Sequence, residues 1–237
     1  MNFTFQSFSL GLDTRPNQDA IAVKCFSSNR LFAAIADGVG GQKGGEIASK
    51  IAVDWAGRLL FEDFSFSFDT VFAEIVKELQ KISLNDKTLI EMATTLSLIT
   101  EKDGRIYFGH VGDSRIYHLR DKGLLQITQD QTEAALLVKQ GILSVSRAKT
   151  YPRRSVLVSA LSVKGDHELM TGSFEIMPRD RILLLTDGVY RLMTKIEIRD
   201  LSISSSSLAE FVRNVSERLC VKGLKDDASL IAVDVLG

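Results

Sequence analysis

A succession of short apolar segments joined by tight turns is the feature that most limits how this chain can fold. Four consecutive segments have the length and apolar content of strands: residues 95–100, 105–111, 114–119 and 124–127. Asp103-Gly104 and Lys122-Gly123 supply turns between neighbouring segments. Strands joined by such short connections run in opposite directions, so this region is predicted to form an antiparallel meander.

Further strands are expected on both sides of this meander, and helices separate them. The additional strand segments are residues 3–8, 20–26, 31–36, 174–176, 181–186 and 228–235. Apolar residues recur at helical spacing over 45–60, 68–82 and 208–219, and residues 131–163 begin with a helical pattern that Pro152 interrupts. Because the strands come in two runs with helices between and after them, antiparallel sheets with helices packed outside are favoured over an alternating βαβ fold.

Composition excludes several classes of function. The chain has 237 residues, a formal net charge of -1 and no block of like charges, which disfavours binding to nucleic acid or to a membrane surface. No segment has the pattern of a signal peptide or of a membrane span. Cys25 and Cys220 belong to no CxxC pair, so two buried free thiols are expected. We expect a cytoplasmic monomer.

Acidic residues stand at the ends of several predicted strands. They are Asp19 at the start of 20–26, Asp37 after 31–36, Asp113 between two meander strands, Asp187 after 181–186, and Asp226 and Asp227 before 228–235. Asp-Gly is a common turn dipeptide, so any one of these residues alone is best interpreted as an ordinary turn aspartate. That interpretation is improbable for the set, since three of its members adjoin a glycine at the end of an apolar strand.

Carboxylates beside apolar strands favour a metal centre. A buried carboxylate is costly unless a cation or hydrogen-bond donors compensate its charge, and a neighbouring glycine allows a backbone carbonyl to approach an ion. Oxygen-only ligands select hard ions such as magnesium or manganese. Two such ions can activate one water as a nucleophile and neutralise a phosphoryl group, so the pattern points to phosphoester hydrolysis.

At five places the sequence resembles the protein phosphatase 2C family in its bacterial form. The motifs are Arg15-Pro16-Asn17-Gln18-Asp19, Ala36-Asp37-Gly38-Val39-Gly40-Gly41, His110-Val111-Gly112-Asp113-Ser114-Arg115-Ile116-Tyr117, Leu184-Leu185-Thr186-Asp187-Gly188 and Lys225-Asp226-Asp227. They follow the family's order from residue 11 to residue 235, so the resemblance covers nearly the whole chain. It implies an α+β fold, a four-layer α/β/β/α sandwich of two antiparallel sheets flanked by helices.

The resemblance also implies a role for each matching residue. Asp37 would bridge two metal ions, and the Gly38 carbonyl would bind the second ion. Asp187 and Asp226 would hold the first ion, and Asp19 would serve the second directly or through water. The ions would be manganese or magnesium, two or three per chain, and a water between two of them would attack the phosphoester.

Three further expectations follow from the same resemblance. Asp113 would help to bind a third, weaker ion, and Arg15 would grip the substrate phosphate with its planar set of donors. Residues 1–237 would form a single metal-dependent phosphatase domain, with a flap at about residues 131–163. The substrates would be proteins phosphorylated on serine or threonine by a cognate kinase.

The sequence departs from the family pattern at several positions. Arg15 stands one residue closer to Asp19 than in many relatives, Asp227 replaces an asparagine, and Ala93 and Tyr151 replace a glycine and a flap histidine. Val39 and Gln42 occupy the positions at which some relatives carry a histidine, so no side chain is assigned as general acid. The departures at Ala93, Tyr151 and Asp227 leave open one alternative, a regulatory or binding module on the same fold. A phosphoesterase that acts on small molecules is a second alternative, because a two-metal centre recognises mainly the phosphoryl group.

Overall fold

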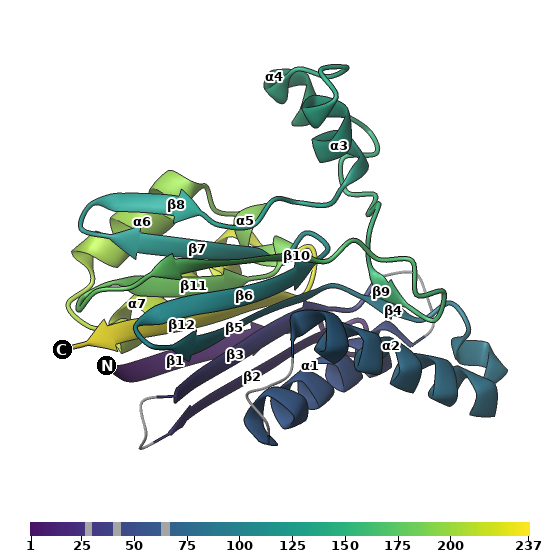
Figure 1. The fold of residues 1–237 in the computed structure, drawn as a ribbon. Coiled ribbons are helices and arrows are strands. Elements are labelled where there is room, and N and C mark those ends of the chain that lie inside the picture. Colours follow the sequence, from purple (N-terminus) through teal and green to yellow (C-terminus); the bar gives the residue numbers. More distant parts are fainter. Residues whose placement is uncertain (27–29, 40–43, 63–66) are drawn as a thin grey trace.

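Two antiparallel sheets form the centre of the computed structural model, which describes residues 1–26, 30–39, 44–62 and 67–237 (Figure 1). Within those residues each of the two sheets has five strands. The first sheet has the order β1 (Asn2–Leu10), β12 (Ala228–Leu236), β11 (Arg181–Leu185), β7 (Arg115–Arg120) and β8 (Gly123–Gln126). The second has the order β10 (Met170–Glu175), β6 (Arg105–Val111), β5 (Leu96–Lys102), β3 (Arg30–Asp37) and β2 (Asp19–Phe26).

Helices cover the outer faces of both sheets, so the predicted four-layer arrangement is confirmed. The helices α1 (Gly45–Glu62) and α2 (Phe68–Asn85) pack against the second sheet, and α6 (Lys195–Ser204) and α7 (Leu208–Lys222) pack against the first. The short helix α5 (Asp187–Tyr190) follows β11 directly, and a 3₁₀ turn, η1 (Lys87–Leu89), follows α2. A two-stranded sheet joins β4 (Ala93–Thr94) to β9 (Leu161–Ser162).

Strand β3 shows why some segments are apolar at every position. Successive side chains of a strand point to opposite faces of its sheet. Leu31, Ala33 and Ile35 therefore face the other sheet, whereas Phe32 and Ala34 face α1 and α2. Both faces are buried, so an unbroken apolar run is needed, and each fully buried leucine or isoleucine stabilises the fold by roughly 1.5–3 kcal/mol.

Residues 131–163, the predicted flap, contain the helices α3 (Glu133–Lys139) and α4 (Val145–Ala148), which stand away from the sandwich (Figure 1). Backbone hydrogen bonds between Glu133 and Val156, and between Val158 and Gln131, join the chain where it enters this helical part to the chain where it leaves it. Within the flap, Glu133 accepts hydrogen bonds from Tyr151 and Arg153. Tyr151 therefore contributes to the internal structure of the flap.

Sequence patterns missed two helices, α5 and α6. Only Ile198 of α6 is buried, so the helix shows little apolar periodicity, and a capping box between Thr194 and Glu197 marks its start instead. Ser207 caps α7 through a hydrogen bond from the Glu210 amide.

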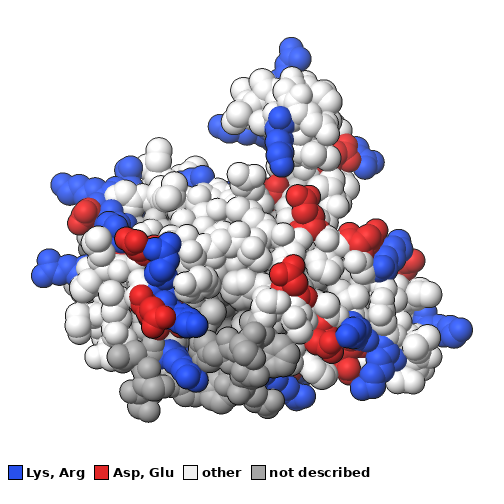
Figure 2. Space-filling model, viewed as in Figure 1, with Lys and Arg blue, Asp and Glu red and all other residues white. Residues whose placement is uncertain are grey.

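Surface properties bear on the remaining expectations. Cys25 and Cys220 are both free, but Cys25 is only half-buried and Cys220 is exposed, which corrects the expectation that both thiols are buried. It lies on the solvent side of α7, opposite the apolar stripe. Among the described residues no helix combines the length and apolarity needed to cross a bilayer. Basic and acidic side chains are interspersed on the face drawn in Figure 2.

Candidate active site

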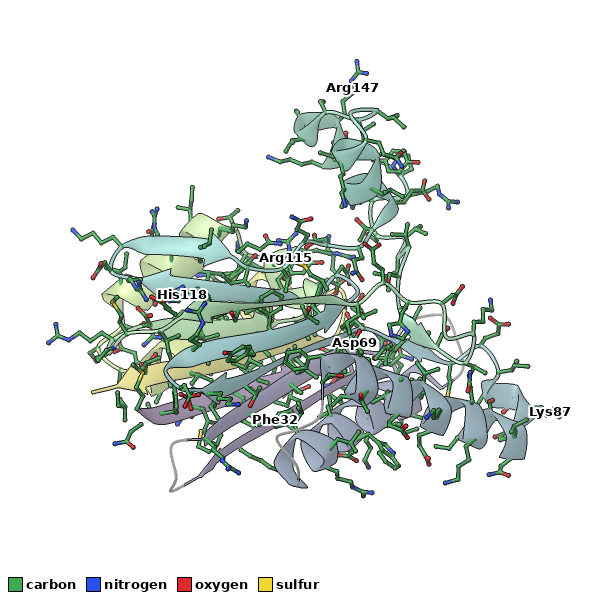
Figure 3. All side chains as sticks on the ribbon, in the orientation of Figure 1. Phe32, Asp69, Lys87, Arg115, His118 and Arg147 are labelled. Atoms are coloured by element: carbon green, nitrogen blue, oxygen red, sulfur yellow. The ribbon has the colours of Figure 1, made fainter. Side chains whose placement is uncertain are left out.

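The predicted carboxylates converge at one end of the sandwich, at the base of the flap. Asp19 begins β2 and lies directly opposite Asp37, the last residue of β3, in the strand register. In the other sheet Asp187 follows β11, and Asp226 precedes the neighbouring strand β12. Asp113 lies in the turn between β6 and β7. The labelled side chain of Arg115, two residues further on, marks this end of the sheets in Figure 3.

Asp37 is the centre of this group. Burial raises the pKa of its carboxyl well above the ordinary value, and the negative charges of Asp19, Asp187, Asp113 and Asp226 raise it further. Each of the four is therefore close enough to influence Asp37 electrostatically. The structure brings together all five aspartates that the sequence predicted as metal ligands.

The backbone around Asp37 is held by hydrogen bonds from a neighbouring turn. The Asp37 amide donates to the Thr95 hydroxyl at 3.0 Å, and the Thr94 hydroxyl donates to the Asp37 carbonyl at 2.9 Å. The amide of Val39 donates to the carbonyl of Ala93 at 2.9 Å, a bond that does not depend on the side chain at position 93. This turn therefore holds the backbone that carries the Asp37 side chain.

Gly38 lies where a side chain has no room. A Cβ atom at this position would be 2.4 Å from the carbonyl of Gly45 and 2.9 Å from that of Gln18. The Gly38 amide donates to the Gln18 carbonyl, which ties the end of β3 to the start of β2. Gly40, Gly41 and Gln42 lie outside the described residues.

Two buried carboxylate oxygens at the site have no hydrogen-bond partner. The Thr186 hydroxyl donates to Asp19 Oδ2 at 2.8 Å, whereas Asp19 Oδ1 is unpartnered. Asp187 Oδ1 is likewise buried and unpartnered. Unsatisfied buried oxygens are rare in native proteins and call for a missing cation, water or donor. A cation that approaches both would remove this cost.

Two arginines compensate part of the negative charge. Arg15 donates to Asp226 Oδ1 at 2.6 Å and also to Asp227, which replaces the family's asparagine. Arg191 lies 2.5 Å from Asp187 Oδ2 and 3.7 Å from Asp113 Oδ2. Arg15, predicted to grip a phosphate, is thus present at the site but is held by two carboxylates.

By charge and donor type, the site fits divalent ions. Six carboxylates and two guanidinium groups gather there, which leaves four negative charges that two divalent ions would balance. All the side-chain donors are oxygens, which suit magnesium and manganese. Among the described residues no three acidic, cysteine or histidine side chains already have the mutual geometry of a metal site. Instead, Oδ1 of Asp226 contacts Arg15, and Oδ2 of Asp187 contacts Arg191.

A cavity of about 700 Å³ adjoins the site between the flap and the first sheet. Its lining includes Arg115, Asp130, Ala135, Lys139 and Lys195. The Arg115 guanidinium lies 3.5 Å from the centre of the Tyr190 ring, and the Tyr190 hydroxyl donates to Asp113. Arg115 and Tyr190 thus join this cavity to the carboxylate cluster.

Sequence reasoning assigned no role to three residues that contact the carboxylates: Thr186, Tyr190 and Arg191. Thr186 was visible only as part of the motif around Asp187. The spacing of Asp187 and Arg191, four residues apart, would have signalled the ion pair if helix α5 had been predicted. His110, the histidine of the motif around Asp113, has a structural role. It is fully buried, its Nδ1 is bonded to Ser97, and burial lowers its pKa to about 4.

We expect the metal-free protein to lose stability as the pH rises from about 5 to about 8. Burial raises the pKa of Asp19 and Asp113 from 3.8 to about 7, and it also raises those of Asp37 and Asp187. The folded state therefore retains protons that the unfolded chain releases above pH 4, and this stabilisation disappears as the pH passes the folded pKa. The lowered pKa of His110 has the opposite effect, because the unfolded chain binds a proton there that the folded state does not, so stability rises with pH. This single group is outweighed by the four carboxyl groups.

The check is thermal unfolding in chelator, in which Tm should fall by roughly 5 °C or more over this pH interval. Excess manganese should abolish the fall, because bound ions compensate the ionised carboxylates. A Tm in chelator that stays constant or rises from pH 5 to pH 8 would contradict the electrostatic description of the site.

Comparison with known proteins agrees with the geometry. The family model of protein phosphatase 2C matches residues 13–228. The serine/threonine phosphatase stp of Listeria welshimeri is 30% identical over 206 residues, which cover 82% of this chain and 80% of that protein. The protein phosphatase PhpP of Streptococcus pneumoniae is 30% identical over 203 residues, with 82% and 81% coverage.

Solved structures show the same fold. The serine/threonine phosphatase PstP/Ppp of Mycobacterium tuberculosis has a TM-score of 0.88 and 27% identity, with complete coverage of both chains. The catalytic domain of PstP in complex with two manganese ions has a TM-score of 0.82 and 26% identity, covering 100% of this chain and 99% of that one. Since the family model spans most of the chain, this protein belongs to the protein phosphatase 2C family and is a phosphoprotein phosphatase.

Proposed function

We propose that this protein hydrolyses phosphoserine and phosphothreonine esters in proteins with the help of two divalent ions, manganese or magnesium. The observation that supports this most is the gathering of four other carboxylates around Asp37, with buried oxygens of Asp19 and Asp187 left unpartnered. The serine/threonine phosphatases named above are relatives over most of the chain, and one of them binds two manganese ions.

The residues proposed to hold the ions are those that the sequence singled out. Asp37 would serve both ions, Asp187 and Asp226 the first, and Asp19 together with the Gly38 carbonyl the second. Asp113, which the family resemblance assigned to a third, weaker ion, lies beside the guanidinium of Arg191. When bound, the ions would supply the Lewis acidity that activates water and compensates the charge of the phosphoryl group.

Neighbouring side chains orient these ligands. The Thr186 hydroxyl donates to Asp19 Oδ2 and accepts a hydrogen bond from the Ser229 amide, so it fixes which oxygen of Asp19 faces the centre. Thr94 and Thr95 hold the backbone of Asp37. His110 is not available to protonate the leaving group, because both ring nitrogens are engaged inside the protein.

We propose that Arg15 binds the substrate phosphate. Its guanidinium lies at the site and donates hydrogen bonds to Asp226 and Asp227. If an ion bound the Asp226 carboxylate, the Arg15 nitrogen that now donates to Asp226 would be available to a phosphate. Asp227 would then keep Arg15 in place.

Replacing Arg15 with alanine is expected to lower kcat/KM for a phosphothreonine peptide roughly 10- to 100-fold, since a hydrogen bond to a charged group contributes about 1.5–3 kcal/mol. Most of the change should appear in KM. Arg213→Ala, which removes an exposed arginine of α7, is the matched control. An unchanged kcat/KM in Arg15→Ala would exclude the phosphate role.

The substrate class is tested by comparing a phosphothreonine peptide with a small phosphoester under the same manganese concentration. We expect the peptide to have the higher kcat/KM. A clear preference for the small ester would instead favour the small-molecule phosphoesterase.

The remaining proposals concern context. Phosphorylated serine and threonine arise by kinase action, so we infer that a cognate kinase supplies the substrates. We also infer that residues 1–237 act as a single domain, a proposal supported by the pairing of β1 with β12 along their full length, and that the protein is a monomer.

A further inference from the structure

Arg191 stands between two of the site's carboxylates. Its guanidinium lies 2.5 Å from Asp187 Oδ2 and 3.7 Å from Asp113 Oδ2. We propose that Arg191 is a built-in cation that closes the space between Asp113 and Asp187 to a divalent ion, and so limits this site to two ions. The inference rests on the proposed two-ion function and adds to it a residue that sets the number of ions.

The position of Arg191 follows from local structure. Helix α5 begins at Asp187, and the Arg191 amide donates to the Asp187 carbonyl at 2.9 Å, which closes one helical turn. Residues four apart on a helix lie on the same face, so the arginine side chain returns toward the carboxylate that begins the helix. Its side chain is 38% exposed, whereas those of Asp113 and Asp187 are below 10%. Arg191 therefore covers the two carboxylates from the solvent side.

The two oxygens of Asp187 have different partners. Oδ2 is bound by Arg191, whereas Oδ1 is buried and unpartnered. One oxygen thus remains for the two-ion centre, and the other is already neutralised. A divalent ion between Asp187 and Asp113 would have to displace the guanidinium, which carries its charge at every physiological pH.

Asp113 is also occupied on the side that faces Arg191. Its Oδ2 accepts a hydrogen bond from the Tyr190 hydroxyl at 3.1 Å. The Tyr190 ring is in turn covered by Arg115, which is fixed by two hydrogen bonds to Asp130. Tyr190 and Arg191 are consecutive residues, so one short segment provides Asp113 with a donor and a positive charge.

The charge balance leads to the same conclusion. With both arginines present, the six carboxylates retain four negative charges, and two divalent ions compensate them. Without Arg191 one further negative charge remains between Asp113 and Asp187, both of them buried. A buried uncompensated charge is costly, so the space should then attract another cation.

The experiment counts manganese ions bound per chain by equilibrium dialysis, with the free Mn²⁺ concentration measured separately. The wild type should bind two ions. Arg191→Ala and Arg191→Gln should each bind one more, and glutamine retains a donor and most of the side-chain volume in case the alanine variant folds poorly. Arg199→Ala, which removes a partly exposed arginine of α6 that pairs with its neighbour Asp200, is the matched control and should bind two.

A double variant assigns the added ion. Arg191→Ala combined with Asp113→Asn should return to two ions, because the space has lost one of its two carboxylates. Arg191→Lys, which retains a positive charge, should also bind two. If neither Arg191→Ala nor Arg191→Gln binds more ions than the wild type, the inference is wrong. A wild type that binds fewer than two ions contradicts the two-ion function itself, so the two failures are distinguishable.

Discussion

Replacing Asp37 with asparagine is expected to reduce kcat for a phosphothreonine peptide by about a thousandfold or more, with the fold intact. Asparagine preserves the shape of the side chain but removes the charge at the centre of the carboxylate group. A loss of roughly 4 kcal/mol of transition-state stabilisation, a modest share of what metal ions provide, corresponds to this factor. Steady-state kinetics at saturating manganese measures it.

The fold of this variant should be at least as stable as that of the wild type without metal. The Asp37 carboxyl is buried among four other acidic groups, which is why its pKa is raised, and asparagine removes that repulsion. Asp54→Asn, at an exposed position of α1, is the matched control and should retain wild-type activity. Activity of Asp37→Asn within tenfold of the wild type would show that Asp37 does not bind the ions.

Replacing Gly188 with alanine is expected to destabilise the fold by about 4 kcal/mol or more, one of the largest effects of any single substitution here. A Cβ atom at this position would lie 2.0 Å from the Asp227 carbonyl oxygen and 3.1 Å from the Ala228 Cα. These are backbone atoms, so no side-chain rotation relieves the clash. Because the added Cβ would push α5 away from β12, it would also move Asp187 away from Asp226, and activity should be lost.

Urea unfolding of Gly188→Ala measures this loss. Gly57→Ala, in the interior of α1, is the control, because its Cβ would make ordinary contacts with the edge of the Phe32 ring at 3.4 Å and with Lys24 Nζ at 4.0 Å, and alanine favours the helix. Gly57→Ala should be neutral or slightly stabilising. If Gly188→Ala unfolds at the same urea concentration as the wild type, the close contact between α5 and β12 is wrong.

The strands and the carboxylate cluster could be predicted because their signals are local. An unbroken apolar run, as in β3, predicts a strand buried on both faces, and a carboxylate followed by glycine at its end predicts a turn that exposes oxygens. The family resemblance then placed Asp19, Asp37, Asp113 and Asp187 at a common site, and the structure brings them together.

The partners of these carboxylates could not be predicted, because they depend on the tertiary fold. Arg15 and Asp226 are 211 residues apart in sequence, and nothing in either segment indicates the ion pair. Helix α5 has only four residues, too few for a periodic pattern, so the approach of Arg191 to Asp187 was not visible either. The charge balance of the site, and with it the expected number of ions, therefore emerged only from the structure.

The most direct test of the two-ion account is phosphate release from a phosphothreonine peptide, measured as manganese is titrated into metal-free wild-type protein while the bound ions are counted. The account predicts no release in chelator, little with one ion bound, and full activity as the second ion binds. Full activity in chelator, or with a single ion per chain, would contradict it. No release at any manganese concentration, from protein shown to be folded, would also contradict it and favour a regulatory module on this fold.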